Sequence, residues 1–302
     1  MNVLQVEKIR KQFGDHVAVD EVSFSIGEGV IFGLIGPNGA GKTTTIRMIM
    51  NIIAPDAGQV TLLGKSDPRE IADLIGYLPE ERGLYRKMKV KDLLRFMTDL
   101  KQMPKAESAK AVDYWLERIE LSEWKNKKIE ELSKGMQQKI QLIGTILHAP
   151  KLLILDEPFG GLDPVNQIVV KDILMDLKKQ GTTIIFSTHV MESAEKLCEE
   201  ILLINKSKQV LYGKLAEIKK GFGRQHLHIE YDGKDSFLES KEIAKFDNYS
   251  NHVEVQLTPS GDAQKVLKEA VSMADIHKFE IKEPSLQEIF IETVGEHAGG
   301  EL

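Results

Sequence analysis

Residues 36–43 combine glycines, a lysine and a hydroxyl side chain in the pattern G-x-x-x-x-G-K-[ST]: Gly36, Pro37, Asn38, Gly39, Ala40, Gly41, Lys42 and Thr43. The apolar run 30–35 precedes this segment and the helix-like run 43–50 follows it, which is the order that a phosphate-binding loop requires. Glycines let the backbone curl around phosphates, and the N–H groups at a helix start attract anions. We expect Lys42 to reach the β- and γ-phosphates of a nucleoside triphosphate, Thr43 to ligate Mg²⁺ and Thr44 to contact the outer phosphates.

Two adjacent carboxylates end a second apolar run. The segment 151–155 reads as a strand, and Asp156 and Glu157 follow its last apolar residue. In an open α/β sheet, ligands bind at the carboxyl ends of the strands, so these side chains should lie beside the phosphate loop. We expect Asp156 to hold Mg²⁺, directly or through water, and Glu157 to orient or polarise an attacking water.

The composition is that of an ordinary globular protein, because 42% of the 302 residues are hydrophobic and 28% are charged. The 40 basic and 46 acidic side chains give a net charge of −6, so no nucleic-acid partner is expected. No apolar run approaches the roughly 20 residues that span a bilayer, and the start does not resemble a signal peptide. Cys198 is the single cysteine, which excludes an internal disulfide and fits a cytoplasmic location.

The order of predicted elements indicates an α/β fold with a parallel-sheet core. Short strands fill residues 1–35, and apolar residues at three- and four-residue steps predict helices across 89–149. Strands at 151–156 and 182–187 then alternate with helices at 165–180 and 191–199, as in a parallel sheet flanked by helices. A hairpin is expected at 201–212. We therefore expect a first domain over 1–220, with a helical subdomain at about 85–149.

A boundary near 221–223 separates this domain from a second pattern. Strands are predicted at 227–231, 253–257 and 276–281, and helices at 263–273 and 285–294. These elements form a small α+β domain over 224–294, a size that can fold alone. We expect residues 295–302 to be a disordered tail. No catalytic constellation is apparent in this second part.

The segment 132–139, L-S-K-G-M-Q-Q-K, resembles the signature of the ATP-binding cassette (ABC) ATPases, usually LSGGQ. Ser133 and Gly135 are retained, whereas Lys134 and Met136 stand in place of a glycine and the glutamine. Without the resemblance, this segment would read as an ordinary helix cap. The resemblance implies that Ser133 and Gly135 contact the γ-phosphate of ATP held by an opposite subunit.

Further segments resemble this family in the expected order. The run 160–164 resembles the D-loop, which implies that Asp163 lies at a dimer interface. The run 187–189 resembles the switch segment, which implies that His189 contacts the γ-phosphate and the attacking water. Phe13 stands where the family places an aromatic side chain against adenine. Taken alone, His189 would read as a structural residue and Phe13 as a core residue.

One position departs from the family pattern. Glu80, in the run 77–85, occupies the place of a glutamine that ligates Mg²⁺ and senses the membrane partner. A carboxylate can also bind Mg²⁺, although it adds charge near the phosphates. Glu80 is therefore a candidate ligand, a part of the coupling surface, or a solvated acidic turn.

The resemblance covers residues 1 to about 220, and it implies an antiparallel β subdomain beside the parallel-sheet core. The run 80–85 together with the C-terminal domain resembles ATP-binding subunits of bacterial efflux systems for sodium and antibiotics. It implies an ATPase that uses Lys42, Glu157 and His189, works as a homodimer or with a paralogue, and drives a separate integral-membrane permease. Its place would be the cytoplasmic face of the membrane. The alternative is a soluble non-transport ABC ATPase acting in translation or DNA maintenance. A module that binds ATP without hydrolysis, or another phosphate-loop enzyme such as a kinase, explains fewer of these segments.

Overall fold

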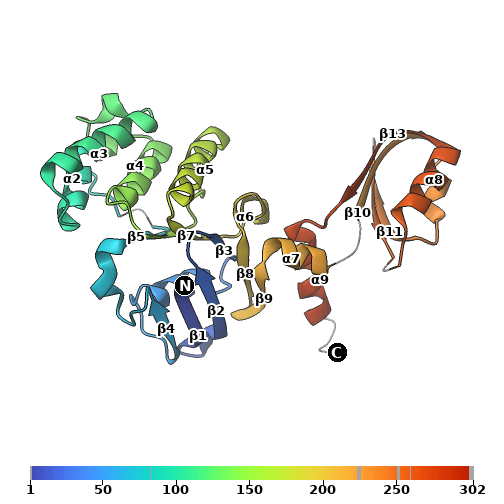
Figure 1. Ribbon diagram of the computed structural model, residues 1–302, viewed down its shortest axis with the longest axis horizontal. Coiled ribbons are helices and arrows are strands. Elements are labelled where there is room, and N and C mark those ends of the chain that lie inside the picture. The colour runs from blue at the N-terminus through green and yellow to red at the C-terminus, as the bar shows by residue number, and fades with distance from the viewer. Residues whose placement is uncertain (1, 82, 223–225, 250–251, 259, 299–302) are drawn as a thin grey trace. The chain divides into compact units, whose positions relative to one another are not determined.

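The computed structural model describes residues 2–81, 83–222, 226–249, 252–258 and 260–298 (Figure 1). The chain forms two compact units, Met1–Gly213 and Lys214–Leu302. Parts of the predicted boundary at 221–223 and of the predicted tail, namely residues 223 and 299–302, lie outside the described residues.

The first unit is built on a nine-stranded sheet with the order β4-β1-β2-β9-β8-β3-β7-β6-β5. The strands are β1 (Asn2–Phe13), β2 (His16–Gly27), β3 (Ile31–Ile35), β4 (Ala57–Leu62), β5 (Ile75–Leu78), β6 (Leu152–Asp156), β7 (Thr183–Thr188), β8 (Glu200–Asn205) and β9 (Lys208–Lys214). The strands β8, β3, β7, β6 and β5 run parallel, whereas β1 pairs antiparallel with both β2 and β4. The predicted parallel core and antiparallel β subdomain are therefore confirmed.

The central strands are apolar along their whole length because both faces of the sheet are covered. Every residue of β3, β6 and β7 is buried, as expected for parallel strands with helices on both sides. Their register places Ile35 opposite Thr188, and Asp156 opposite Ser187. The last residues of three strands that are distant in sequence thus meet at one edge of the sheet.

The helices of this unit are α1 (Lys42–Ile49), α2 (Val90–Leu100), α3 (Lys105–Arg118), α4 (Lys134–Ile146), α5 (Pro164–Lys179) and α6 (Met191–Leu197), with 3-10 turns η1 (Pro68–Leu74), η2 (Ser122–Trp124) and η3 (Ile129–Glu131). Figure 1 shows α2, α3, α4 and α5 grouped on one side of β5 and β7, with β1, β2 and β4 on the other. The helical pattern predicted over 89–149 is confirmed as α2, α3 and α4.

The second unit is a four-stranded antiparallel sheet with the order β11-β12-β10-β13. Its elements are α7 (Leu215–Gly221), β10 (His226–Gly233), η4 (Ser236–Glu239), β11 (Ile243–Asn248), β12 (Val253–Leu257), α8 (Ala263–Met273), β13 (Ala274–Lys282) and α9 (Leu286–Ala298). Its core joins buried side chains of β10, β12, η4 and α8. The predicted α+β architecture is confirmed, and α9 continues to Ala298, beyond the start of the predicted tail.

Candidate functional site

The phosphate loop joins the end of β3 to the start of α1, and its shape depends on glycine. Gly36 has a φ of 156° and Gly41 a φ of 107°, conformations that side-chain-bearing residues rarely adopt. A Cβ atom would lie 2.1 Å from the Ile204 carbonyl oxygen at Gly36 and 2.3 Å from the Ala18 carbonyl oxygen at Gly41. The loop is therefore pressed against neighbouring backbone, and the N–H groups of Gly36 and Ala40 donate to the carbonyl oxygens of Thr188 and Pro37. The first turn of α1, which follows the loop, is the part that presents N–H groups to an anion.

Lys42 is buried within this loop. Its side chain is 6% exposed, and Nζ donates to the carbonyl oxygens of Gly36 at 2.8 Å and Pro37 at 3.1 Å. Burial lowers the pKa of Lys42 below its usual value, while the carboxylates of Glu157, Asp156 and Glu80 oppose that shift. The fold thus places a desolvated ammonium group where a phosphate can meet it.

Asp156 ends β6 and is 2% exposed. The Ser187 hydroxyl donates to its Oδ1 and also accepts a hydrogen bond of 3.0 Å from the Glu157 N–H. The second oxygen, Oδ2, is buried and accepts no hydrogen bond from the described residues. A buried carboxylate oxygen without a partner is costly unless a cation binds it. With the Thr43 hydroxyl on the loop, these oxygens fit a hard divalent cation such as Mg²⁺.

Glu157 is held between a cation and an imidazole. Its φ of 50° is unusual for a residue other than glycine, and its side chain is only 13% exposed. Oε1 lies 2.8 Å from His189 Nδ1 and 3.7 Å from Lys42 Nζ. Backbone strain of this kind persists only where surrounding contacts hold it, and it is common at active sites. The carboxylate is placed to accept a proton from a water molecule.

Two cavities meet over these groups. One of about 400 Å³ is lined by Phe13, His16, Ala18, Asn38, Gly39, Gly41, Lys42, Thr43, Thr44, Glu80 and Glu157. The other, of about 310 Å³, is lined by Asn38, Leu78, Pro79, Glu80, Gln138, Gln141, Asp156, Glu157, Gly160 and His189. Because Asn38, Glu80 and Glu157 line both, the cavities form one depression. Phe13 lies at its rim with half of its surface exposed.

Three predicted site residues lie elsewhere on the same unit. Ser133 precedes α4, where its Oγ accepts from the Met136 N–H at 3.2 Å, and Asp163 caps α5 in the same way. A Cβ atom at Gly135 would lie 3.5 Å from the Asn166 side chain of α5, so these helix starts are neighbours. Ser133, Gly135 and Asp163 line neither cavity described above. A single chain therefore does not bring them to its own phosphate loop.

Ser187 and Gln138 are residues to which the sequence assigned no role. Ser187 links Asp156 to the backbone of Glu157, and Gln138 Nε2 donates to the Pro158 carbonyl oxygen at 2.8 Å. The sequence places Ser187 at the carboxyl end of a predicted strand, two residues before His189. That position could have marked Ser187 as a site residue. The contact of Gln138 depends on how α4 packs, which no local pattern encodes.

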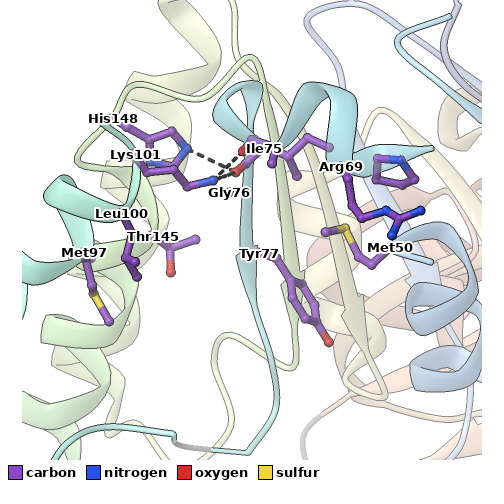
Figure 2. A pocket seen from close by; sticks show the side chains of 13 residues that line it. Met50, Arg69, Ile75, Gly76, Tyr77, Met97, Leu100, Lys101, Thr145 and His148 are labelled. Carbon is purple, nitrogen blue, oxygen red and sulfur yellow. Dashed lines mark hydrogen bonds between the residues drawn. The ribbon is translucent and has the colours of Figure 1, made fainter. Parts of the chain in front are cut away.

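A separate groove of about 350 Å³ lies between the helical subdomain and the outer strand β5 (Figure 2). Its walls come from η1, β5, α2 and α4. Lys101 Nζ donates to the carbonyl oxygens of Ala72 and Ile75, and His148 Nε2 lies 3.1 Å from the same Ile75 oxygen. Burial lowers the pKa of both side chains. The sequence did not predict this groove.

Comparison with known proteins agrees with this architecture. The ABC transporter family matches residues 19–160, and the DrrA1-3-like ATP-binding protein C-terminal domain matches 213–294. An uncharacterized ABC transporter ATP-binding protein of Bacillus subtilis, YhaQ, is 46% identical over 97% of this chain and 99% of its own. The linearmycin resistance ATP-binding protein LnrL of the same organism is 31% identical over 97% and 98%. A solved ATP-binding subunit of an ABC transporter superposes with a TM-score of 0.69 and 28% identity, covering 73% of this chain and 93% of that one.

The fold and the site define a phosphate-loop ATPase of the cassette type. The chain belongs to the ATP-binding proteins of ABC transporters, and it carries the DrrA-like C-terminal domain. ATP is its nucleotide, and hydrolysis to ADP and phosphate is the activity of this family. Among the described residues, no helix is both long and apolar enough to span a bilayer.

Proposed function

We propose that this chain powers export through a separate membrane permease, by closing on a second ATP-binding subunit, its own copy or a paralogue, when ATP is bound. One observation carries the proposal. Lys42, Asp156, Glu157 and His189 surround one depression, whereas Ser133, Gly135 and Asp163 lie outside it. The site is complete only if a head-to-tail partner supplies its own Ser133 and Gly135, with Asp163 at the interface between the two.

Within such a site, most of the chemistry is positioning and charge neutralisation. The glycine loop, Lys42 and Thr44 hold the phosphates, and Phe13 stacks on the base. Thr43 and Asp156 would hold Mg²⁺, which would neutralise phosphate charge, and Glu80 is a further candidate ligand. Glu157 accepts the proton of the attacking water, while His189 orients that carboxylate and contacts the γ-phosphate.

Dividing the site between two chains converts nucleotide binding into motion. ATP favours the closed pair because only that state places the start of the partner's α4 at the γ-phosphate. Loss of the γ-phosphate removes that differential contact and releases the pair. Hydrolysis is therefore tied to a cycle of closing and opening, which a transporter can use.

The groove of Figure 2 is the place that we assign to a cytoplasmic helix of the permease. Strand β5 contributes Tyr77 to this groove and then leads directly into Leu78 and Glu80 of the nucleotide depression. A helix in the groove would touch the strand that ends beside the phosphates and also Leu100 and Met97 of α2. Motion of β5 or of α2 would therefore be transmitted to the membrane partner.

The lining of the groove is apolar with basic groups at its edges. Leu100 is 64% exposed and Lys101 adds positive charge, whereas the charge of Arg69 is paired with Asp67 at 2.6 Å. These features fit an amphipathic helix with an apolar face and an acidic side chain. Export as the direction of transport is supported by the 35% identity, over 72% of this chain, with the Nod factor export ATP-binding protein I of Ralstonia nicotianae. Such an arrangement places the chain at the inner face of the cell membrane.

The test is co-purification from membranes of the source cells, with identification of the retained protein. We expect the wild-type chain to retain an integral protein with several apolar spans of roughly 20 residues each. Leu100→Glu should abolish retention, while Tyr114→Glu, also exposed in the helical subdomain but outside the groove, should not. Retention of ribosomal or nucleic-acid components instead would contradict the proposal.

A further inference from the structure

The four-stranded sheet of the second unit has one apolar and one polar face. Leu227 and Ile229 of β10 and Val253 and Val255 of β12 point into the core shared with α8. Side chains alternate along a strand, so the residues between them lie on the opposite face. The antiparallel register pairs His228 of β10 directly with Glu254 of β12. Two residues before Glu254, and on the same face, is His252.

His228 is an unusual residue for such a face because it is only 9% exposed. Its Nε2 lies 3.1 Å from a carboxylate oxygen of Glu230. An ionised carboxylate only accepts hydrogen bonds, so the ring proton sits on Nε2. The other nitrogen, Nδ1, is buried and has no hydrogen-bond partner among the described residues.

The unpartnered nitrogen faces two further donor groups. His228 Nδ1 lies 3.9 Å from Glu254 Oε1, too far for a hydrogen bond. The His252 ring is stacked on Tyr249, and its centroid lies 4.6 Å from that of His228. One donor atom from each of His228, His252 and Glu254 lies within 4.8 Å of the others. A lone pair beside a carboxylate is unfavourable unless a cation lies between them.

We propose that His228, His252 and Glu254 bind a divalent transition-metal ion of the Zn²⁺ class. Two imidazoles and one carboxylate suit such an ion, whereas Mg²⁺ and Ca²⁺ take oxygen ligands. The hydrogen bond from Nε2 to Glu230 is the outer contact that metal-binding histidines usually make, and it leaves Nδ1 free to ligate. Tetrahedral zinc ligands lie about 3.3 Å apart, so donor atoms that now lie within 4.8 Å need to approach each other by up to about 1.5 Å. Glu254 is partly exposed, which leaves a path for the ion.

The experiment is a metal titration of the full-length, tag-free protein after metal removal. Co²⁺ binding is followed by visible absorption, and Zn²⁺ affinity by displacement of Co²⁺. We expect one equivalent to bind with a tetrahedral spectrum, and this signal to persist in Asp156→Asn, which alters the nucleotide site. Glu230→Gln should weaken Zn²⁺ binding by about 10- to 100-fold, as other outer-contact changes do.

Loss of binding should follow from His228→Ala, His252→Ala and Glu254→Gln, with affinity reduced by more than about 100-fold. Because the Glu254 side chain is partly exposed, Glu254→Gln tests the site without disturbing the core. The matched control is His277→Ala, because His277 lies on the same sheet but pairs with Asp232 at 2.8 Å, away from the cluster. Absence of stoichiometric binding in the wild-type chain, or equal binding in Glu254→Gln and His277→Ala, would overturn the proposal.

Discussion

Asp156 and Glu157 are neighbours in the sequence, yet their side chains occupy different environments. Asp156 is the last residue of a buried strand, and Ser187 fixes one of its oxygens while the other stays without a partner in the described structure. Glu157 takes a left-handed backbone conformation, which turns its carboxylate toward His189 and Lys42. Two consecutive residues therefore supply one carboxylate suited to binding a cation and one suited to accepting a proton.

Glu157→Gln tests whether Glu157 accepts the proton of the attacking water. The amide keeps the shape of the side chain but cannot take a proton from water, so ATP turnover should fall by about 10²- to 10⁴-fold. ATP binding measured by calorimetry should persist, and the ATP-bound pair should accumulate in light scattering. Wild-type phosphate release by a clean preparation of Glu157→Gln would reject the assignment.

Ser187→Ala tests the role of Asp156 in cation binding, because Ser187 positions the Asp156 carboxylate. Loss of the hydroxyl removes the hydrogen bond to Asp156 and the acceptor of the Glu157 N–H. We expect the Mg²⁺ concentration for half-maximal ATPase activity to rise by about 10- to 100-fold, as for other outer contacts of metal ligands. Ser193→Ala, a buried serine on α6, serves as the control. An unchanged Mg²⁺ dependence in Ser187→Ala would show that this link has no part in cation binding.

At the scale of elements, apolar runs predicted the strands that end at the site. The runs 30–35, 151–156 and 182–187 each begin one residue before a fully buried strand, namely β3, β6 and β7, and helix 263–273 has the predicted bounds. Strand β5 escaped prediction because it has four residues, and β11 because its side chains are mostly exposed. The short strands predicted within residues 1–35 are longer than expected, since residues 16–27 form one strand, β2, whose backbone continues through the polar pair 20–21.

At the site, the sequence likewise predicted the features that local order determines and missed those that depend on long-range contacts. The phosphate loop, Asp156 and Glu157 could be predicted from local order, because each lies at or directly after the end of a strand. The hydrogen bonds of Ser187 require the register of β6 against β7, and the groove beside Lys101 requires the packing of α4 against both β5 and α2. Contacts of this kind arise from long-range pairing, which a single sequence does not display.

The start of α9 gives a prediction about pH. Glu288 accepts from the Ser285 N–H at 2.6 Å and lies 3.4 Å from His226 Nδ1. His226, and then Ser285, lower the pKa of Glu288 from 4.5 to about 2, against the effect of partial burial. The unfolded chain therefore binds this proton more readily, and the stability that Glu288 contributes is present above about pH 4.5 and is lost toward pH 2.

The measurement is urea unfolding of wild-type and Glu288→Gln protein, followed by circular dichroism between pH 2 and 6. The variant should be less stable near pH 6, and the difference should shrink as the pH falls through this window. Lys278→Gln, which removes an exposed pair with Glu280, serves as a charge control on the same unit. A difference between wild type and Glu288→Gln that stays constant with pH would contradict the assignment.

At the scale of the whole molecule, the proposed division of the site between two chains would distinguish this chain from a self-sufficient ATPase. The phosphate loop and the start of α4 belong to one unit, but Ser133 and Gly135 do not line its nucleotide depression. Hydrolysis by a pair then requires each member to supply different groups. Because hydrolysis would depend on both chains, ATP could drive the closing of two subunits. The metal cluster proposed on the second unit does not depend on this sharing of the nucleotide site.

The most direct measurement mixes two inactive variants. Lys42→Ala removes the phosphate-loop cation, and Ser133→Arg blocks the surface offered to the partner. A mixed head-to-tail pair contains one site with both defects and one intact site, so ATPase activity should return on mixing and depend on total concentration. Activity that stays at the level of the separate variants, or full activity of Ser133→Arg alone, would contradict the shared site.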